Sequence, residues 1–382
     1  MKGLGVFINS PYLGGAERSI ISQLKEIQGY KLSFYIPFLL EESEASELIS
    51  HIKSHHANGD INLIKFPSSL YKISRSQTKK IPFILLSLIL FVFHLRENIR
   101  KHDVIWVNGN KIGLPILLNL ILGFKGKMVY HLRDYPSKDS LFKYIWRLFR
   151  YIKAEEVLVL ANSYDVQKKA ESMILRSNVV FDTCYNPIDA MTAKNGKQED
   201  GIVIGIASML APWKGIHSVL LCEAMYRFEL VAAGIRAINI YGDDIYATEG
   251  ENKNYKKDIL KFVDQDSLIN FKGRVAPQKI FSDIDVLVHP SLKPEPFGRV
   301  VAEAYESQTA LITTGLGGSG ELILDDCAIR IIPYDYSGLK DALIRCCDES
   351  FRKELVQSGN KMSQNIKEQQ RDFWKRLERF IA

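Results

Sequence analysis

Short apolar runs alternate with helix-length segments along the chain, and this alternation predicts the fold. A first series of apolar runs indicates strands near residues 2–9, 31–37, 61–66, 103–107, 127–131, 156–160 and 178–181. A second series indicates strands near residues 202–208, 237–241, 268–271, 284–288, 310–313 and 328–332. Helical periodicity fills most segments between the strands, and such alternation is typical of a parallel, doubly wound sheet. The pattern therefore predicts an α/β protein with two such sheets.

The length of the chain also indicates two domains. At 382 residues it exceeds what one hydrophobic core usually organises, so we expect two domains of about 190 residues each. The polar stretch 193–201 is typical of a linker, and a new apolar strand follows it. We expect an N-terminal domain at 1–190, a C-terminal domain at 191–360 and a polar helix at 361–382. The apolar anchors of that last helix are Phe373, Trp374, Leu377 and Phe380.

Charge and cysteine content indicate where in the cell the protein acts. Residues 1–189 hold 25 Lys and Arg against 17 Asp and Glu, whereas residues 190–382 hold 25 against 27. A basic first half suits an anionic membrane or a phosphate-bearing acceptor. The five cysteines lack metal-ligand spacing, and their odd number favours reduced thiols over a disulfide framework. The first residues are predicted to form a strand, and they lack the apolar core of a signal peptide. We therefore expect a cytoplasmic protein.

One segment of the first half is the most apolar run in the chain. IPFILLSLILFVFHL, residues 81–95, is flanked by Lys79, Lys80, Arg96, Arg100 and Lys101. It is shorter than the ~20 residues that a membrane span needs, and His94 interrupts it near its end. We interpret it as a buried crossover helix, and a membrane-surface helix is the alternative.

A second segment, residues 140–153, combines apolar periodicity with positive charge. Helical spacing relates Leu141, Phe142, Ile145, Leu148, Phe149 and Ile152. The basic residues fall elsewhere on the helix and are Lys143, Arg147, Arg150 and Lys153. With Tyr144, Trp146 and Tyr151 at its flanks, such a helix could rest on an anionic bilayer. A surface helix that docks its apolar stripe onto the sheet explains the same periodicity equally well.

The stretch HPSLKPEPFGRVVAEA, residues 289–304, places two glutamates on either side of an expected helix start. Pro294 and Pro296 hold Glu295 on extended backbone, so Glu295 is a loop carboxylate. The helical spacing that follows predicts a helix from about Arg299, which carries Glu303.

The chemistry of this helix start points to a ligand. N–H groups at a helix N-terminus bind phosphate oxygens, and carboxylates beside them accept hydrogen bonds from hydroxyl groups. Lys214 and Gly215 likewise open a helix, where a lysine is disfavoured by the dipole unless an anion is bound. A diphosphate with hydroxyl groups on both sides describes a nucleotide sugar. Near the N-terminus, Gly14 and Gly15 let the backbone approach a ligand, although an ordinary turn explains them too.

These residues resemble a known family. The stretch 289–304 is similar to the E-x7-E motif of the retaining glycosyltransferases of family 4, as are DIDVLVHPS before it and GGSGELI after it. GGAER near the N-terminus and YNPID at 185–189 add to the resemblance, which is strongest over residues 202–325. It implies the GT-B architecture: two Rossmann-like domains facing across a cleft, with the last helix crossing back to the first domain.

The resemblance implies a role for each candidate residue. It suggests a retaining, metal-independent hexosyltransferase with a UDP- or GDP-sugar donor. The catalytic residues that it implies are Glu295, Lys214 and His131. The residues expected to bind the donor are Glu303, Gly298, Arg299, Val300, Phe297, Gly14, Gly15 and Arg274. Met209 stands where the family usually has an arginine, and the candidates to compensate for it are Arg274 and Arg299.

Partners and rival functions complete the expectation. We expect a saccharide or lipid-linked saccharide acceptor, peripheral contact with an anionic membrane on its cytoplasmic face, and no nucleic acid. Asp283 and Asp285 form a D-x-D pattern, but Asp285 reads as a strand-start residue, so we predict no metal and no cofactor besides the donor. GLGGSG at 315–320 comes too late in its domain for a dinucleotide site. The rivals are a glycosidase and a non-catalytic GT-B assembly subunit.

Overall fold

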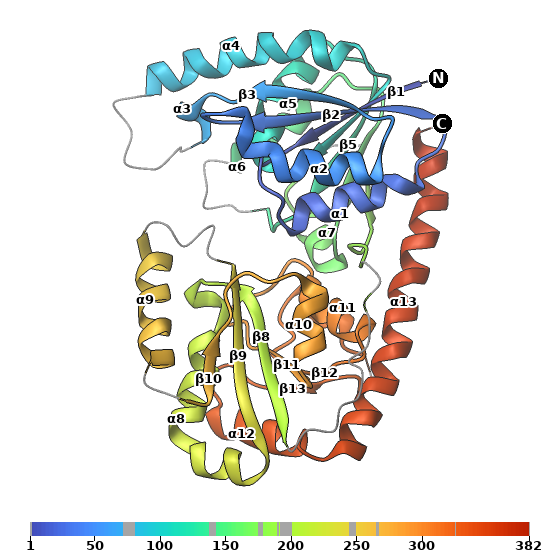
Figure 1. Ribbon diagram of the computed structural model, residues 1–382. Coiled ribbons are helices and arrows are strands. Elements are labelled where there is room, and N and C mark those ends of the chain that lie inside the picture. The colour runs from blue at the N-terminus through green and yellow to red at the C-terminus, as the bar shows by residue number, and fades with distance from the viewer. Residues whose placement is uncertain are drawn as a thin grey trace. The chain divides into compact units, whose positions relative to one another are not determined.

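The chain forms two compact units. The structure is a computed structural model that describes residues 2–71, 81–136, 143–174, 179–188, 191, 201–243, 250–264, 267–324 and 326–381. The first domain comprises Met1–Pro187 and Gln369–Ala382, and the second comprises Ile188–Glu368 (Figure 1). The boundary expected from the sequence follows residue 190. Apart from Gly201, the predicted linker lies outside the described residues.

The first domain is built on a seven-stranded parallel sheet. Its strands are β1 (Lys2–Ile8), β2 (Tyr30–Phe38), β3 (Asp60–Lys65), β4 (Val104–Asn108), β5 (Lys127–Leu132), β6 (Val157–Ala161) and β7 (Val179–Thr183). Their order is β3-β2-β1-β4-β5-β6-β7, and every neighbouring pair is parallel. Each strand overlaps an apolar run that predicts it, because a sheet buried on both faces needs apolar residues throughout.

Helices cover both faces of this sheet. One face carries α1 (Gly15–Gln23), α2 (Ser46–His55) and the end of α13 (Glu349–Ile381). The other carries α3 (Ser68–Tyr71), α4 (Ile81–Arg100), α5 (Asn110–Ile121), α6 (Lys143–Leu148) and α7 (Tyr164–Glu171). Short 3-10 turns are η1 (Leu24–Glu26), η2 (Glu42–Ala45) and η4 (Phe149–Tyr151). Successive strand residues point to opposite faces, so Val6 joins one core and Phe7 the other.

The second domain repeats the plan with six parallel strands. They are β8 (Ile202–Met209), β9 (Ile235–Asp243), β10 (Ile269–Phe271), β11 (Val286–His289), β12 (Ala310–Thr313) and β13 (Ile329–Arg330), in the order β10-β9-β8-β11-β12-β13. The remaining elements are η5 (Pro212–Lys214), α8 (Ile216–Ala232), α9 (Gly250–Asp264), α10 (Pro277–Asp283), α11 (Arg299–Glu306), η6 (Gly318–Leu322) and α12 (Tyr336–Arg345). Both sheets follow the doubly wound order 3-2-1-4-5-6, so the predicted fold class, α/β with two Rossmann-like domains, is confirmed.

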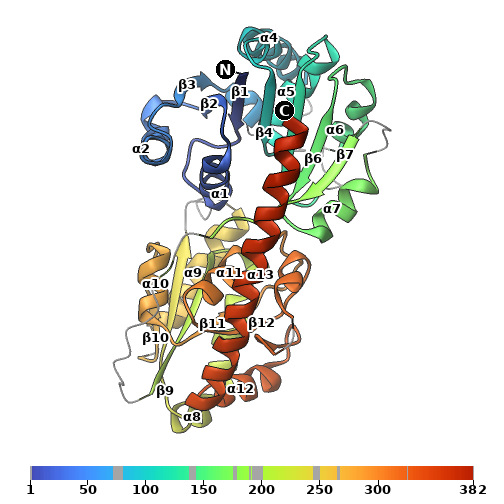
Figure 2. The ribbon, with the colours of Figure 1, turned by 90° about the vertical axis from the view of Figure 1, so that its right-hand side faces the viewer.

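Helix α13 begins in the second domain and ends in the first. Phe373 and Leu377 are buried in the core formed with α1 and α2. The Arg376 guanidinium makes two hydrogen bonds to the Asp182 carboxylate at 2.7 and 2.8 Å, and Gln369 Nε2 donates to Thr183 O at 2.7 Å. These contacts hold the end of α13 beside β7 (Figure 2).

Helix α4 differs from its prediction. It crosses over from β3 to β4 as expected, but it is longer than the apolar run and only one of its faces is buried. Phe91, Leu95 and Ile99 are buried in the core, whereas Phe83 and Leu90 on the opposite face are 63 % and 61 % exposed. The interpretation as a buried helix is therefore wrong. Among the described residues, Pro82–Arg100 is the one helix long and apolar enough, by length and composition alone, to cross a membrane.

The basic segment 140–153 also differs from its prediction. Helix α6 is short and passes into η4, and the predicted apolar positions Leu141 and Phe142 lie outside the described residues. Trp146, Phe149 and Ile152 are buried in the same core as the inner face of α4. The apolar side of this segment thus docks onto the sheet, as the second interpretation proposed. The tryptophan is not exposed at a flank, but the side chains of Arg147, Arg150 and Lys153 are exposed.

Candidate functional site

The candidate site lies where the strand order of the second sheet reverses. Strands β8 and β11 are neighbours, and the chain leaves them in opposite directions along the sheet. The loops after such strands diverge and leave a crevice at their carboxyl ends, which is where open α/β sheets bind ligands. Lys214 lies in η5 after β8, and Glu295 lies in the loop after β11. The two residues predicted from separate motifs therefore meet at one edge of the sheet.

Backbone hydrogen bonds fix the loop that carries Glu295. The Glu295 N–H donates to Leu316 O at 3.0 Å, and the Gly318 N–H donates to Glu295 O at 2.8 Å. These bonds form an isolated parallel bridge between Glu295 and Gly317. The Leu292 N–H donates to Trp213 O at 2.8 Å, which ties the same loop to η5. The GLGGSG segment thus supports the Glu295 loop.

Three side chains converge on one oxygen of Glu295. Lys214 Nζ lies 2.5 Å and Ser291 Oγ lies 2.6 Å from Glu295 Oε1. His289 Nε2 lies 3.2 Å from the same atom. Glu295 itself is only 5 % exposed. A carboxylate held by three donors in a buried site has a fixed orientation, which is what electrostatic catalysis requires.

A further hydrogen bond orients His289. Thr313 Oγ1 lies 3.1 Å from His289 Nδ1, and it accepts the Gly315 N–H at 3.1 Å. If the threonine hydroxyl donates its proton to Nδ1, the N–H of the imidazole is on Nε2 and is directed at Glu295. Sequence reasoning missed His289, Ser291 and Thr313. The signal that could have found them is the change from apolar to polar residues at the ends of β11 and β12.

The electrostatics favour an ionised Glu295. Burial is the largest single influence and would raise the pKa of this carboxyl group. The hydrogen bond from His289 and the charge of Lys214 together outweigh burial and hold the pKa of Glu295 well below its ordinary value of 4.5. The carboxylate is therefore charged at any physiological pH.

Glycines allow two helices to begin at this edge. Gly215 caps α8 with φ 71°, and a Cβ there would lie 2.1 Å from Pro290 O. Gly298 caps α11 with φ 79°, and a Cβ there would lie 2.7 Å from Ser319 Cβ. Larger residues are excluded at both positions by conformation and by space. The site therefore has two helix N-termini, whose first N–H groups have no partner within the helix.

Helix α11 carries the second predicted glutamate. Glu303 is 6 % exposed, and its Oε1 accepts a hydrogen bond from Arg299 Nε at 2.7 Å, which links the two residues across one helical turn. The helix begins at Arg299 as predicted. Phe297 just before it is buried, and Val300 in its first turn is half-buried. All of the predicted residues from 295 to 303 thus surround one helix start.

The remaining predicted residues of the second domain lie further out. Met209 is the last residue of β8 and is half-buried. Arg274 is exposed after β10, which β9 separates from β8. Asp285 lies at the amino end of β11, where its carboxylate accepts the Val203 N–H at 2.8 Å, and Asp283 pairs with Lys279 at 3.1 Å. No group of three His, Cys, Asp or Glu side chains among the described residues is arranged to hold a metal ion.

The first-domain candidates lie at the carboxyl edge of the other sheet. His131 is in β5, is 0 % exposed and packs against Trp106 with the ring centroids 5.7 Å apart. Neither ring nitrogen has a hydrogen-bond partner among the residues that the structure describes. Burial, and to a smaller extent the charge of Arg133, hold the pKa of His131 well below its ordinary value. Gly14 caps α1 in an extended conformation, and Gly15 begins that helix.

A polar cluster that sequence reasoning did not identify lies near His131. The Arg133 guanidinium is 9 % exposed and donates to Asn108 Oδ1 at 2.7 Å, Asn186 Oδ1 at 2.7 Å and Gln23 Oε1 at 3.2 Å. Glu17 of α1 is 4 % exposed, and burial raises its pKa to about 7, against the opposing effects of the Glu17 N–H and Arg133. Burying charged groups such as Arg133 and Glu17 is costly. The buried cluster that holds them is therefore a second polar centre of the protein, and it lies in the first domain.

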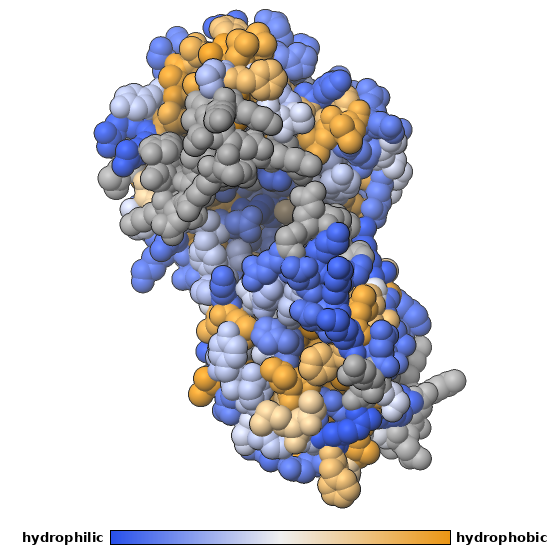
Figure 3. Space-filling model, turned by 90° about the vertical axis from the view of Figure 1, so that its left-hand side faces the viewer, coloured by the Kyte–Doolittle hydropathy of each residue, from blue (hydrophilic) through white to orange (hydrophobic). Residues whose placement is uncertain are grey.

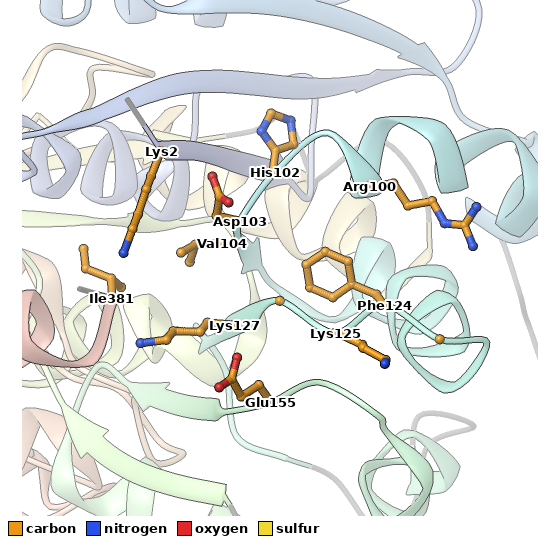
Figure 4. A pocket seen from close by; sticks show the side chains of 12 residues that line it. Lys2, Arg100, His102, Asp103, Val104, Phe124, Lys125, Lys127, Glu155 and Ile381 are labelled. Carbon is orange, nitrogen blue, oxygen red and sulfur yellow. The ribbon is translucent and has the colours of Figure 1, made fainter.

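Two pockets lie at the opposite edges of the sheets. One, of about 450 Å³, is lined by Lys2, Arg100, Asp103, Lys127 and Glu155 among others, and Figure 4 shows Arg100 extending away from Lys2 and Lys127. Two of its charged side chains already have partners, because Lys127 Nζ donates to Phe380 O at 2.7 Å and Asp103 accepts the Gly3 N–H at 2.7 Å. The other, of about 400 Å³, is next to Asp285 and α13. Both pockets are at amino ends of strands, where doubly wound folds do not bind substrates.

Comparison with known proteins finds one relative that spans nearly the whole chain and others that match parts of it. Residues 187–369 match the family model described as glycosyl transferases group 1. An uncharacterized glycosyltransferase of Methanocaldococcus jannaschii is 25 % identical over 388 aligned residues, which cover 96 % of this chain and 94 % of that protein. A lipopolysaccharide 1,2-N-acetylglucosaminetransferase of Salmonella typhimurium is 27 % identical over 146 residues, or 37 % of each chain.

The fold has solved counterparts. The crystal structure of Anabaena HepE in complex with UDP and glucose is similar with a TM-score of 0.73 at 18 % identity, and the match covers 99 % of this chain and 100 % of that one. At this identity the likeness shows the fold, which is GT-B. Together with the family model, which matches residues 187–369, and the archaeal relative, it supports a glycosyltransferase.

Proposed function

We propose that the protein is a retaining hexosyltransferase that uses a UDP- or GDP-sugar and glycosylates a saccharide or lipid-linked saccharide in cell-surface polysaccharide or lipopolysaccharide assembly. The observation that carries this proposal is the contact between Lys214 and Glu295 at the edge where α8 and α11 begin. This arrangement puts a cation and a carboxylate side by side, next to the start of α11, where the first N–H groups of a helix can bind phosphate.

The donor's diphosphate would bind at the helix N-termini. The first N–H groups of α11, at Arg299 and Val300, together with the Lys214 ammonium, would receive the charge that develops on the leaving nucleotide diphosphate. Glu303, held by Arg299, would accept hydrogen bonds from the ribose hydroxyls. Because Met209 replaces the arginine that resembling enzymes usually have, Arg299 or Arg274 would supply the second positive charge.

Glu295 would act on the sugar. Loss of the diphosphate leaves positive, oxocarbenium-like character on the sugar ring, and a fixed carboxylate nearby stabilises that charge more in the transition state than in the ground state. The same carboxylate can accept hydrogen bonds from sugar hydroxyls. In this account Lys214 stabilises the negative charge on the departing diphosphate, and Glu295 stabilises the positive charge on the sugar ring. One ion pair would therefore stabilise both charges that develop during transfer.

The low pKa of Glu295 argues against the glycosidase alternative. A glycosidase needs one carboxylic acid with a raised pKa to protonate the leaving oxygen. Glu295 is instead held ionised by His289 and Lys214. Glu303 is paired with Arg299, and the observed contact is an ion pair at 2.7 Å. The pair of glutamates is therefore better suited to binding and charge stabilisation than to acid catalysis.

His131 is the proposed contribution of the first domain. A buried histidine whose two ring nitrogens have no partner among the described residues is unusual, and such groups commonly await a ligand. With its pKa lowered by burial, the imidazole is neutral and can both donate and accept a hydrogen bond with sugar hydroxyls. Gly14 and Gly15 would let the backbone approach the same ligand.

The setting of the reaction is also a proposal. The partial relative from Salmonella is named for lipopolysaccharide synthesis, and a basic first half suits a peripheral protein on the cytoplasmic face of an anionic membrane. We propose no metal requirement. A non-catalytic assembly subunit is the second candidate, and the absence of the usual arginine at Met209 is the observation that favours it.

Reaction products test the proposal. The protein is incubated with UDP- and GDP-sugars and saccharide acceptors, and NMR reports the anomeric configuration of the first product formed. We expect nucleotide diphosphate release together with a product that retains the donor's configuration. Inversion would contradict retention, and sugar release from a saccharide without nucleotide-sugar consumption would indicate a glycosidase. A protein that binds no donor would be an assembly subunit.

A further inference from the structure

The outward side of α4 is an apolar surface that the described residues of the chain leave exposed. We call it the α4 outer face. It consists of Phe83, Leu85, Leu86, Ile89, Leu90 and Phe93, whose exposed fractions lie between 52 % and 63 %. Figure 3 shows it as hydrophobic surface near the top of the view. Large apolar side chains scattered singly are normal on a protein surface, but six on one helix face form a patch that marks an interaction site.

The α4 outer face is not needed for folding. The inner side of the helix, with Phe91, Val92, Leu95 and Ile99 at helical spacing, already fills the core of the first domain. The packing includes a hydrogen bond from Asn119 Nδ2 of α5 to Val92 O at 2.8 Å. Polar residues on the outer side would satisfy the fold equally well. The outer side is apolar from Phe83 to Phe93, so it has another role.

This helix cannot cross a bilayer while the first domain is folded. Both of its ends lead into the same sheet, β3 before it and β4 after it, and its inner side is packed against that sheet's core. A transmembrane helix would separate its two ends by the thickness of the bilayer, about 30 Å. An amphipathic helix can instead lie in the plane of the interface, with its apolar side among the acyl chains.

Positive charge predominates in the helix layer that contains α4. Between Ile81 and Glu156 the sequence carries 12 Lys and Arg against six Asp and Glu, and the helices of this segment cover one face of the sheet. Among the side chains that the structure describes in this layer, the exposed basic ones are Arg100, Lys101, Lys125, Arg147, Arg150 and Lys153. Basic side chains beside an apolar stripe are complementary to anionic lipid headgroups over acyl chains. An anionic bilayer is therefore a better partner for this surface than a second copy of the chain, because two basic surfaces repel each other.

We propose that the α4 outer face inserts into the interface of an anionic bilayer and that the basic residues of α6 and its surroundings bind the headgroups. The proposal deepens the lipid-linked acceptor part of the proposed function, on which it rests, by naming the surface that attaches the enzyme. It also changes which helix makes the apolar contact with the membrane. Helix α4 supplies that contact, since the apolar side of α6 is buried in the core.

Flotation with lipid vesicles tests this proposal. The purified full chain is mixed with vesicles of phosphatidylcholine, or of phosphatidylcholine and phosphatidylglycerol in equal parts, and centrifuged through a density gradient. We expect wild type to float with the anionic vesicles and far less with the neutral ones. The double variant Leu86→Glu, Leu90→Glu should lose binding by at least about tenfold, because its charged side chains cannot enter the acyl region.

A matched control exists on the second domain. Met225 and Phe228 of α8 are 59 % and 87 % exposed, so Met225→Glu, Phe228→Glu makes the same change on another exposed apolar pair. This control should float like wild type, and circular dichroism should show all variants folded. The proposal is overturned if wild type stays at the bottom, if the α4 variant floats like wild type, or if wild type forms dimers that only the α4 variant disrupts.

Donor titration separates this proposal from the proposed function. The same preparations are titrated with UDP- and GDP-sugars without vesicles. Retained donor binding in the Leu86→Glu, Leu90→Glu variant together with lost flotation supports both proposals. If wild type floats but binds no donor, the α4 outer face still binds the bilayer and the proposed transferase activity is contradicted. If wild type binds donor but does not float, the transferase proposal stands and the membrane proposal is contradicted.

Discussion

Lys214 Nζ and Glu295 Oε1 are 2.5 Å apart, although 81 positions separate the two residues in the sequence. Their side chains are only 15 % and 7 % exposed, so the pair is shielded from water. Burying two charges is costly unless each compensates the other, and this pair persists because His289 and Ser291 also satisfy the carboxylate. The Lys214 ammonium is therefore held in position before a donor binds. The diphosphate of the donor would compete with Glu295 for this ammonium.

Removal of the lysine should affect both binding and stability. We expect Lys214→Ala to weaken the binding of UDP or GDP by ~1.5–3 kcal/mol, since a charge-assisted contact is lost. It should also lower the free energy of unfolding by ~3–5 kcal/mol, because Glu295 is left buried without the opposite charge of the lysine. Calorimetric titration and urea unfolding measure the two effects. Lys279→Ala, which removes an exposed surface pair, is the control and should change neither substantially. Unaltered nucleotide affinity in a folded Lys214→Ala protein would remove Lys214 from the site.

Acid should reveal the ionisation of Glu295. Its pKa lies below the ordinary value of 4.5, so the carboxylate contributes stability that is present above pH 4.5 and is lost as the pH falls below it. Glu295→Gln lacks this contribution. The difference in unfolding free energy between wild type and Glu295→Gln should be largest near neutrality and shrink on acidification below pH 4.5. Urea unfolding at several pH values measures it. A difference that grows on acidification would contradict the assigned hydrogen bonds.

Glu17 should show the opposite dependence. Burial raises its pKa to about 7 from 4.5, so the folded protein holds this proton more tightly than the unfolded chain does. Stability should therefore fall as the pH rises from 4.5 to 7. We expect Glu17→Gln to be more stable than wild type by up to ~3 kcal/mol above pH 7, and the gain to vanish near pH 4.5. Glu26→Gln, at an exposed position nearby, is the control. A gain that is constant with pH would show that the carboxyl group does not titrate in this range.

Metal chelation should leave turnover intact. Asp283 ends α10 and Asp285 directly precedes β11, and both carboxylates already have partners in Lys279 and the Val203 N–H. The account needs no divalent cation, because Lys214 and the helix N-termini carry the diphosphate charge. Turnover assayed with and without EDTA should be equal. Loss of turnover that magnesium or manganese restores would show that a metal takes part.

The sequence predicted the regular parts of the fold. Every strand of both sheets was recognisable, because strands buried on two faces are apolar along their whole length. The start of α11 at Arg299 was readable from Gly298 and the helical spacing after it. Glu295 and Lys214 were found as separate motifs, and only the strand order brings them together at the switch point between β8 and β11.

Contacts between distant segments could not be read in the same way. His289 and Thr313 end two different strands, so their contact depends on the pairing of β11 with β12. The environment of α4 was misjudged because an apolar run has the same composition whether it faces a core or a membrane. The buried state of Trp146 was missed because helical periodicity does not indicate which side docks. In each case tertiary packing decides, and composition does not.

The most direct test of the central claim is a titration of the protein with UDP- and GDP-sugars that compares two glutamates of α11. Glu303 is the proposed ribose ligand, whereas Glu306, three residues later, pairs with Lys367 of α13 at 2.7 Å. The account predicts saturable binding of one donor class by wild type and by Glu306→Gln, and binding weakened by ~1.5–3 kcal/mol in Glu303→Gln. It would be contradicted if wild type bound no donor, or if Glu303→Gln and Glu306→Gln bound it equally well.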